Sequence, residues 1–436
     1  MARPLQELTE AGVAVWVDSI ARDWLEKGEL RRLRDQYFVV GVTSNPTIFA
    51  KALAEGSFYD DDIRRLAAQG LDDPTIFEKL ALDDIRAAAA DLAVVHERTG
   101  GLDGRVSFEL PPAIASDTGS SIRETERLFR ELGRPNVFIK IPATAAGVPA
   151  IRAGIAKGIN VNVTLIFSIA RYREVMEAYL AGLEDRVAAG HPVDHIFSVA
   201  SFFVSRVDTN VDAKLQKLVE AGGPQAEKAR ARLGTAAIDN AKLAYAASGE
   251  VFAGPRWDAL AARGANVQRP LWASTSTKNP AYRDVLYVEE LIAPGTVNTM
   301  PIETMQAFDD HGVVRGPTAT QGMDRARRLW SDLAELGIRE DEVGRELEEE
   351  GVRKFADSYN QAVDLGDHAA RQVEPAEALG DLLGLVGVVG PQGGVALPDA
   401  GADAARRRAA ARRAAAGRGH PATCSRSRAT VRTASL

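Results

Sequence analysis

Residues 136–144, NVFIKIPAT, place a single lysine, Lys140, inside an apolar run of strand length. Pro142 closes the run, and the small residues after it can open a helix. A lysine with apolar neighbours must extend its ammonium to solvent, pair it with a carboxylate, or lose the charge, because burying an unpaired ammonium is costly. An uncharged lysine amine attacks carbonyl carbons and forms imines. Lys140 is therefore a candidate nucleophile, and a solvent-facing lysine on an edge strand is the alternative.

An imine-forming lysine needs neighbours that move protons and others that anchor the far end of the substrate. Glu109 and Thr164 lie in the apolar runs before and after that of Lys140, where they can hold a water beside the amine and shuttle its protons. Asp18 can take the proton of a substrate hydroxyl while a C–C bond breaks. The candidate anchors are two amides for sugar hydroxyls (Asn45, Asn162), two cations for a phosphate (Arg206, Lys278) and two neutral donors (Ser201, Ser274).

Eight short apolar runs have the length of strands and alternate with longer helical patterns. The runs cover residues 13–19, 38–44, 105–110, 137–141, 160–167, 196–204, 270–274 and 296–300. The helical patterns cover residues 22–36, 75–97, 120–132, 169–189, 207–247 and 279–290. Strands that alternate with helices predict an α/β protein with a parallel sheet, and eight of them in this length predict a single closed (β/α)8 barrel of the TIM type with extra helices.

Polar residues stand at the C-terminal ends of most of these runs. In a barrel, these ends face one mouth, where active sites form, so we expect the candidate residues to converge there. Each of them also has a purely structural interpretation, because Asp18, Asn45 or Ser168 taken alone is typical of a helix N-cap. The repetition of the pattern from strand to strand favours a site.

Other kinds of site have little support in the sequence. His191 and His195 have the spacing of neighbouring positions on a helix, but Pro192 argues against a helix there and no third ligand is close, so we expect loop histidines. Residues 100–104, GGLDG, lack the spacing of a phosphate-binding or dinucleotide-binding loop. We therefore expect no metal site.

Charge is distributed unevenly along the 436 residues. Residues 406–436 contain nine arginines and no acidic residue, which leaves 44 basic against 60 acidic residues before them. We expect an acidic folded body, residues 1–370, that does not bind nucleic acid and holds any phosphate with a few placed cations. The segment 371–436 is predicted to be a low-complexity extension, disordered from about residue 400. An arm for RNA or anionic lipid is the alternative for this basic tail.

The cysteine count and the hydropathy predict the compartment. One cysteine, Cys424, excludes an intramolecular disulfide framework, and the residues near Met1 lack the apolar core of a signal peptide. No apolar stretch approaches the roughly 20 residues that span a bilayer. We expect a cytoplasmic protein without a membrane partner.

The motifs, taken in order, resemble those of the transaldolase family. The resemblance covers about residues 5–365 and runs through VWVDSIAR, GVTSNPTIFAKA, VSFELPP, NVFIKIPAT, GINVNVTLIFS, SVASFFVSRVD and LWASTSTKNPAY. The chain looks like the long actinobacterial form, which has helical additions between the second and third strands and at the C-terminus. The resemblance implies a cytoplasmic enzyme on an α/β barrel, without metal or organic cofactor, monomeric or homodimeric, that acts on sugar phosphates in the non-oxidative pentose phosphate pathway.

The resemblance also implies a reaction and a role for each residue. The family moves a dihydroxyacetone unit from sedoheptulose 7-phosphate to glyceraldehyde 3-phosphate, giving erythrose 4-phosphate and fructose 6-phosphate. It implies Lys140 as the Schiff-base lysine, Asp18 as the acid/base group, and Glu109 with Thr164 as the holders of a water. The implied substrate-binding residues are Asn45, Asn162, Ser201, Phe203, Arg206 and Ser274. Many members have an arginine two residues beyond a serine after the seventh strand, where this chain reads ASTSTK, and we place Lys278 in that second phosphate role.

Two other functions stay open at this point. A class I aldolase on the same barrel would release free dihydroxyacetone by hydrolysing the lysine-bound intermediate. A barrel that only binds phosphosugars, with the basic tail as an interaction arm, would form no imine.

Overall fold

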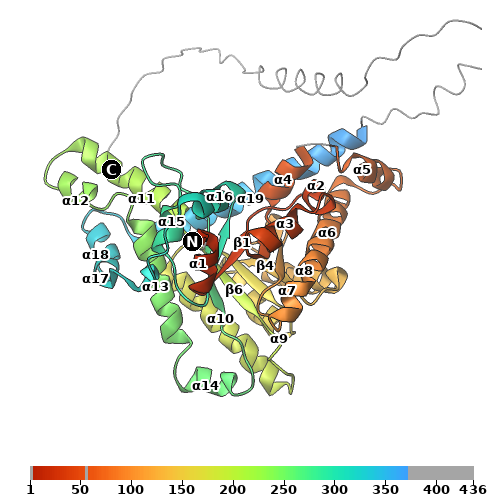
Figure 1. The fold of residues 1–436 in the computed structure, drawn as a ribbon, viewed down its shortest axis with the longest axis horizontal. Helices are drawn as coiled ribbons and strands as arrows, with labels where there is room; N and C mark the ends of the chain where they lie inside the picture. Colours follow the sequence, from red (N-terminus) through yellow and green to blue (C-terminus); the bar gives the residue numbers. More distant parts are fainter. Residues whose placement is uncertain (1–2, 55–56, 372–436) are drawn as a thin grey trace, which may run out of the picture. The chain divides into compact units, whose positions relative to one another are not determined.

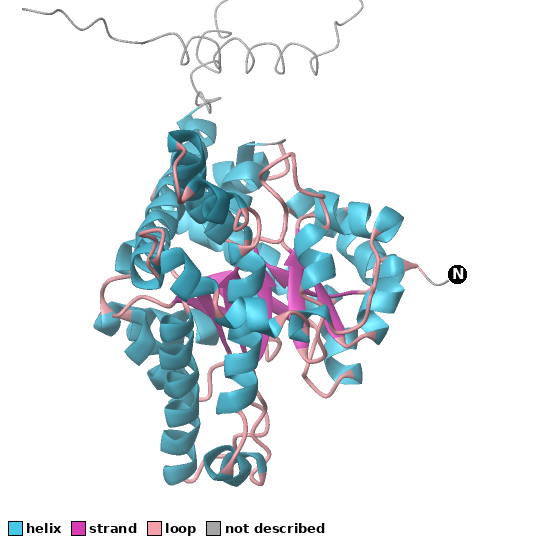
Figure 2. Ribbon diagram, turned by 90° about the vertical axis from the view of Figure 1, so that its left-hand side faces the viewer, coloured by secondary structure: helices cyan, strands magenta, loops and turns pink. Residues whose placement is uncertain are grey.

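The computed structural model describes residues 3–54 and 57–371. Its eight strands pair in parallel and in chain order, and the last strand pairs with the first, so the sheet closes into a barrel. The strands are β1 (Val13–Val17), β2 (Val39–Thr43), β3 (Arg105–Glu109), β4 (Val137–Pro142), β5 (Val161–Ile166), β6 (Ser198–Phe203), β7 (Arg269–Ala273) and β8 (Thr296–Met300). Figure 2 shows the strands at the centre and helices around them. The predicted (β/α)8 barrel of the TIM type is confirmed.

Helices follow every strand and also form additions. The α-helices as far as β6 are α1 (Pro4–Glu10), α2 (Arg22–Glu26), α3 (Glu29–Gln36), α4 (Pro46–Ala54), α5 (Asp60–Ala67), α6 (Asp73–Asp91), α7 (Ala93–Arg98), α8 (Thr118–Leu132), α9 (Gly147–Ala156) and α10 (Ile169–Ala188). The later ones are α11 (Ser205–Ala221), α12 (Ala226–Arg230), α13 (Ala236–Val251), α14 (Pro255–Ala261), α15 (Leu286–Glu290), α16 (Ile302–His311), α17 (Met323–Arg327), α18 (Leu329–Ala334) and α19 (Glu340–Arg371). Two short 3-10 helices are η1 (Pro112–Ile114) and η2 (Thr318–Thr320).

Four predicted helical patterns differ in extent from the helices that form. The pattern over residues 75–97 divides at Leu92 into α6 and α7. The pattern over residues 22–36 divides into α2 and α3 because Gly28 takes a positive φ of 74°, which ends a right-handed helix. The pattern over residues 207–247 divides into α11, α12 and α13, and Gly222 and Gly234 have positive φ at the two breaks. Of residues 279–290, only α15 is helical.

Aromatic side chains fill the barrel beneath its C-terminal mouth. Side chains of a barrel strand alternate between the interior and the helices, so Trp16 points inward with Asp18, and Phe138 with Lys140. The Trp16 and Phe138 rings stack with centroids 6.1 Å apart. The indole fits because the facing residue on β2 is Gly41, where a Cβ would overlap the Trp16 ring. Both rings are buried, and they form a packed floor below Asp18 and Lys140.

The backbone is irregular at two strand ends beside this mouth. The register of β5 against β6 shifts between Val163 and Ile166, and Leu165 within the shift takes a φ of 58°. Ser274, the residue after β7, takes a φ of 57°. This left-handed conformation is costly for residues other than glycine, and it concentrates at functional sites where the surrounding packing enforces it.

The helical additions lie where the resemblance implies them. Helices α4 to α7 stand between β2 and β3, and α16 to α19 follow β8. A separate buried cluster holds α5 against α6 (Tyr59, Ile63, Leu66, Ile76, Leu80). The long helix α19, blue in Figure 1, runs beside α4. It brings the C-terminal part of the described chain back over residues near the start.

Some of the predictions fall on residues that the structure does not describe. The predicted extension over residues 371–436 lies outside the described residues except for Arg371, the last residue of α19, so its disorder stays a prediction. None of the described helices combines the length and the apolar composition that crossing a bilayer requires.

Candidate active site

A cavity of about 310 Å³ lies at the C-terminal ends of the barrel strands. Eight of the eleven predicted site residues line it: Asp18, Asn45, Lys140, Ser201, Phe203, Arg206, Ser274 and Lys278. The other three, Glu109, Asn162 and Thr164, do not line this cavity but stand on β3 and β5, the two strands that flank Lys140. The structure thus brings eight of the candidates together at one mouth of the barrel.

Lys140 is buried, with 4% of its surface exposed. Its Nζ donates to Oε2 of Glu109 at 3.1 Å and to the carbonyl oxygen of Ser44 at 3.1 Å. The register of β3 against β4 pairs Glu109 directly with Lys140, so both side chains point to the interior. The alternative of a solvent-facing lysine on an edge strand is therefore wrong. Instead, the Lys140 amine is buried and pairs directly with the carboxylate of Glu109.

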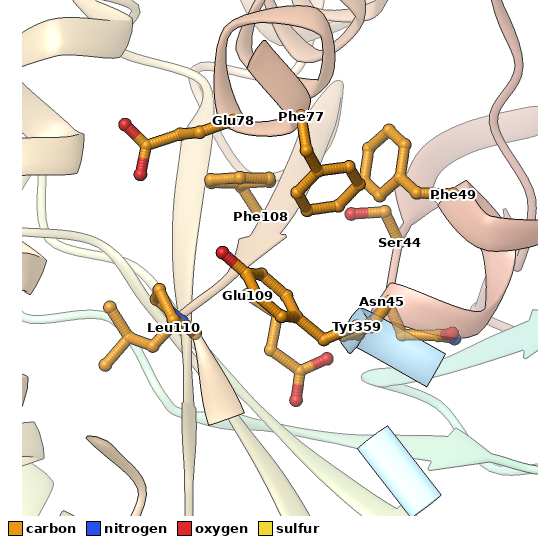
Figure 3. Close-up of a pocket in the computed structure, with 11 residues that line it drawn as sticks. Ser44, Asn45, Phe49, Phe77, Glu78, Phe108, Glu109, Leu110 and Tyr359 are labelled. Atoms are coloured by element: carbon orange, nitrogen blue, oxygen red, sulfur yellow. The ribbon is translucent and has the colours of Figure 1, made fainter. Parts of the chain in front are cut away.

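Glu109 lies between the lysine and a narrow second cavity. Burial raises the pKa of its carboxyl, and the neighbouring Lys140 opposes that rise. The second cavity, about 20 Å³, is walled by Phe49, Phe77, Phe108 and Tyr359. Figure 3 shows the carboxylate of Glu109 pointing away from the three phenylalanine rings. A carboxyl with a raised pKa in contact with an amine is suited to exchange protons with it.

Asp18, the residue after β1, lines the main cavity. Thr43 Oγ1 donates to its Oδ1 at 2.7 Å, and the same hydroxyl is 2.6 Å from Thr299 Oγ1. Burial raises the pKa of Asp18, while Lys140 and Thr43 oppose the rise. Asp18 is not an N-cap, since Ala21 holds that position for α2. Its carboxyl is held in one orientation by a neutral donor and is free to accept a proton.

The two β5 candidates differ in how their polar atoms are used. Asn162 Nδ2 donates to Ser107 Oγ at 3.0 Å, and Asn162 Oδ1 accepts from Ser201 Oγ at 2.7 Å. Asn162 therefore holds Ser201, which lines the cavity, in place. Thr164 Oγ1 is buried and has no hydrogen-bond partner among the described residues. An unpartnered buried hydroxyl near the lysine is available to a substrate or a water.

Two cationic side chains, Arg206 and Lys278, line the cavity. Arg206, in the first turn of α11, has its guanidinium carbon 5.1 Å from the centre of the Phe203 ring. Burial lowers the pKa of Arg206, and one of its Nη atoms is buried without a partner among the described residues. Partial burial and the nearby Arg206 lower the pKa of Lys278, whose Nζ donates to Ser276 Oγ at 2.7 Å. Two adjacent cations with spare donors suit a phosphate.

Backbone and capping contacts fix the remaining candidates. Asn45 Oδ1 accepts from the backbone N–H of Ile48 at 3.1 Å, so it caps α4 and lines the cavity at once. Ser274 Oγ is 2.8 Å from Ser205 Oγ, which joins the end of β7 to the start of α11. Ser168 does cap α10, as its structural interpretation predicted.

Several further residues contribute to this site, and most of them gave a weak signal in the sequence or none. Thr43 and Ser44 contact Asp18 and Lys140, and the alternation of β2 was a signal for an inward Thr43. Lys51 on α4 and Phe355 on α19 also line the main cavity. Phe355 gave no local signal, because its position depends on how a distant helix packs. Within residues 3–54 and 57–364, no group of three or more His, Cys, Asp or Glu side chains is placed to hold a metal ion.

The arrangement supports carbonyl chemistry on a phosphorylated substrate. A buried amine touches one carboxyl, and a second carboxyl and two cations line the same cavity. An amine and a carboxyl in contact are suited to forming and hydrolysing an imine. The second carboxyl is placed to move a hydroxyl proton.

Comparison with known proteins agrees with this geometry. The family model described as Transaldolase/Fructose-6-phosphate aldolase matches residues 15–365. The chain is 51% identical over 364 residues to a transaldolase of Parafrankia sp. (strain EAN1pec), covering 84% of this chain and 97% of that protein. It is 52% identical over 361 residues to a transaldolase of Mycolicibacterium paratuberculosis (83% and 95%) and 52% over 364 residues to one of Thermobifida fusca (84% and 97%). The chain is thus an enzyme that belongs to the transaldolase family.

Proposed function

We propose that this chain performs the transaldolase reaction through an imine on Lys140. The amine attacks the ketone of sedoheptulose 7-phosphate, water leaves, and the C–C bond beyond the imine carbon breaks to release erythrose 4-phosphate. A dihydroxyacetone unit stays on the lysine as an enamine, adds to glyceraldehyde 3-phosphate, and leaves as fructose 6-phosphate after hydrolysis of the imine. The observation that carries this proposal is the 3.1 Å contact between Lys140 Nζ and Glu109 in the barrel interior.

The two carboxyl groups divide the proton transfers. Glu109, in contact with the amine, and the unpartnered hydroxyl of Thr164 shuttle protons while the carbinolamine forms and loses water. Asp18 takes the proton of the substrate hydroxyl when the C–C bond breaks and returns it when the new bond forms. Its raised pKa supports this role, because a carboxyl with a pKa closer to neutrality is a stronger base once it is ionised.

The remaining candidates bind the substrate. Asn45 and Ser201 contact sugar hydroxyls, with Asn162 orienting Ser201 through its 2.7 Å hydrogen bond. Arg206 and Lys278 hold the phosphate, with Ser274 beside them as a neutral donor. Phe203 supports Arg206 by packing against its guanidinium.

A substitution of the lysine tests the proposal. Lys140→Met should abolish formation of fructose 6-phosphate from sedoheptulose 7-phosphate and glyceraldehyde 3-phosphate while leaving the circular dichroism spectrum unchanged. Lys157→Met is the matched control, because Lys157 is a surface lysine that pairs with Glu126. Turnover by folded Lys140→Met at the rate of the control would refute the proposal.

We also propose that the enzyme works in the cytoplasm as a monomer or homodimer. The use of a single cysteine in 436 residues supports a reducing compartment. Light scattering at micromolar concentration would measure the mass directly, and a tetramer or larger assembly would contradict the second part.

A further inference from the structure

The helix α19 crosses the C-terminal mouth of the barrel and is fastened at both sides of it. Polar contacts join it to α10, α11 and α4 in turn. These contacts are Ile169 N to Glu340 Oε1 (2.7 Å), Lys214 Nζ to Glu346 Oε2 (2.6 Å) and Thr47 Oγ1 to Ser358 Oγ (2.8 Å). Figure 1 shows the same course, with blue α19 reaching from the neighbourhood of α11 to that of α4. The helix therefore spans the opening between β5 and β2.

The helix packs closely against the barrel at Gly351, where a larger side chain would not fit without a shift. At Gly351, a Cβ would be 2.8 Å from Leu165 Cδ2 and 3.6 Å from an Nη atom of Arg206. Leu165 is the residue with positive φ in the irregular part of β5, so the strand and the helix meet there. One turn later on the same face stands Phe355, because positions four apart in a helix share a face. Because Gly351 has no side chain, α19 packs closely enough against the barrel for Phe355 to reach the cavity.

The ring of Phe355 lies beside both the amine of Lys140 and the guanidinium of Arg206. Its centre is 5.7 Å from Lys140 Nζ and 5.8 Å from Cζ of Arg206. The side chain is 5% exposed and lines the main cavity. A further turn along, Tyr359 packs against Phe77 with ring centres 5.2 Å apart, which anchors this part of α19. Tyr359 is among the side chains labelled in Figure 3.

The intermediate on Lys140 has two fates, and the groups around it decide between them. Addition to the acceptor aldehyde completes transfer. In the competing route the enamine carbon takes a proton from water, which gives the imine of dihydroxyacetone. A second water then adds to the imine carbon, releasing dihydroxyacetone and the free lysine amine. The competing route needs water at the lysine, so a side chain that excludes water favours transfer.

We propose that Phe355 determines the specificity for transfer by excluding water from the lysine-bound intermediate. The phenyl ring forms the part of the cavity wall that lies 5.7 Å from the amine, and it has no polar atom that could hold a water or donate a proton. The inference rests on the proposed imine at Lys140 and goes beyond it, because it assigns the choice between transfer and hydrolysis to a residue on the C-terminal helix.

The test measures the ratio of free dihydroxyacetone to fructose 6-phosphate produced from sedoheptulose 7-phosphate and glyceraldehyde 3-phosphate. Phe355→Ala opens the space above the amine and should raise this ratio by about tenfold or more. Phe355→Leu keeps most of the apolar volume and should raise it much less. Leu347→Ala is the control, since Leu347 is buried on the same helix, two turns earlier, and lines neither cavity.

Each outcome separates the inference from the proposed function. Borohydride trapping should capture the intermediate on Lys140 in all four proteins. A ratio unchanged in folded Phe355→Ala that still forms the adduct overturns the role of Phe355 and leaves the imine mechanism standing. An equal rise in Leu347→Ala also overturns it, because loosening of the helix would then suffice. Failure to trap an adduct in the unsubstituted enzyme contradicts the proposed function itself.

Discussion

Replacing Asp18 with asparagine separates the two halves of the proposed mechanism. The amide has nearly the shape of the carboxyl, so its Oδ1 can keep the 2.7 Å hydrogen bond from Thr43. What the variant loses is the base. Removing a positioned general base typically costs about 10² to 10⁴ in rate, which is roughly 3 to 5 kcal/mol of barrier. Imine formation depends on Lys140 and Glu109, which are unchanged, so it should continue.

The effect of Asp18→Asn on stability has a definite sign. Burial raises the pKa of Asp18 in the folded state, so between its unfolded and folded pKa values the folded protein binds more protons than the unfolded one. The free energy of unfolding then falls as pH rises through that window. Above the folded pKa, the folded protein carries the full cost of burying the ionised carboxyl. The amide has no such penalty, so the variant should be at least as stable as the parent at pH 8 in urea denaturation. A loss of activity cannot then be ascribed to unfolding.

The assay for Asp18→Asn uses fructose 6-phosphate, borohydride and mass spectrometry. In the parent enzyme, trapping should give the three-carbon fragment on Lys140, because cleavage precedes reduction. In the variant, the adduct should carry the intact six-carbon phosphosugar, and release of glyceraldehyde 3-phosphate should slow by at least about 10². The parent should also lose turnover as pH falls through the raised pKa of Asp18. A fall in adduct yield parallel to the fall in turnover would refute this division of labour.

Three further perturbations test other parts of the account. Arg206→Ala should lower kcat/KM for phosphorylated substrates by about 10- to 150-fold, which corresponds to the loss of a charge-assisted hydrogen bond of about 1.5 to 3 kcal/mol. An equal loss with unphosphorylated analogues would argue against a phosphate role. Gly41→Ala should lower the free energy of unfolding by about 1 to 3 kcal/mol, because the new Cβ would overlap the Trp16 ring. An unchanged midpoint of urea denaturation would contradict this packing. Burial raises the pKa of Asp208 to about 7. The free energy of unfolding of Asp208→Asn, relative to that of the parent, should therefore rise between pH 4 and 7 by at most about 1.4 kcal/mol per pH unit. A difference that does not change with pH would be inconsistent with that pKa.

The strands and most of the site were predictable because their signals are local. A strand of five or six residues with one polar side chain at its C-terminal end, such as Glu109 or Lys140, shows its facing by alternation alone. The closed barrel then follows from eight such strands. The N-caps at Asn45 and Ser168 were likewise predictable, because a short polar side chain directly before a helical pattern is typical of an N-cap.

The parts that were missed depend on contacts between distant segments. The division of the helical pattern over residues 22–36 is set by a glycine whose positive φ only the fold reveals. The hydrogen bonds of Asn162 to Ser107 and Ser201 join side chains of neighbouring strands, which no pattern within β5 reveals. Phe355 reaches Lys140 only because α19 packs across the mouth, which no pattern within the helix indicates.

The central claim is that the buried amine of Lys140 carries the substrate carbon during turnover. Reduction with borohydride in the presence of sedoheptulose 7-phosphate, followed by peptide mapping, measures this directly. We expect one three-carbon adduct, on the peptide that contains residues 136–144, and no adduct in Lys140→Met. An adduct on another lysine, or rapid turnover with nothing trapped, would contradict it.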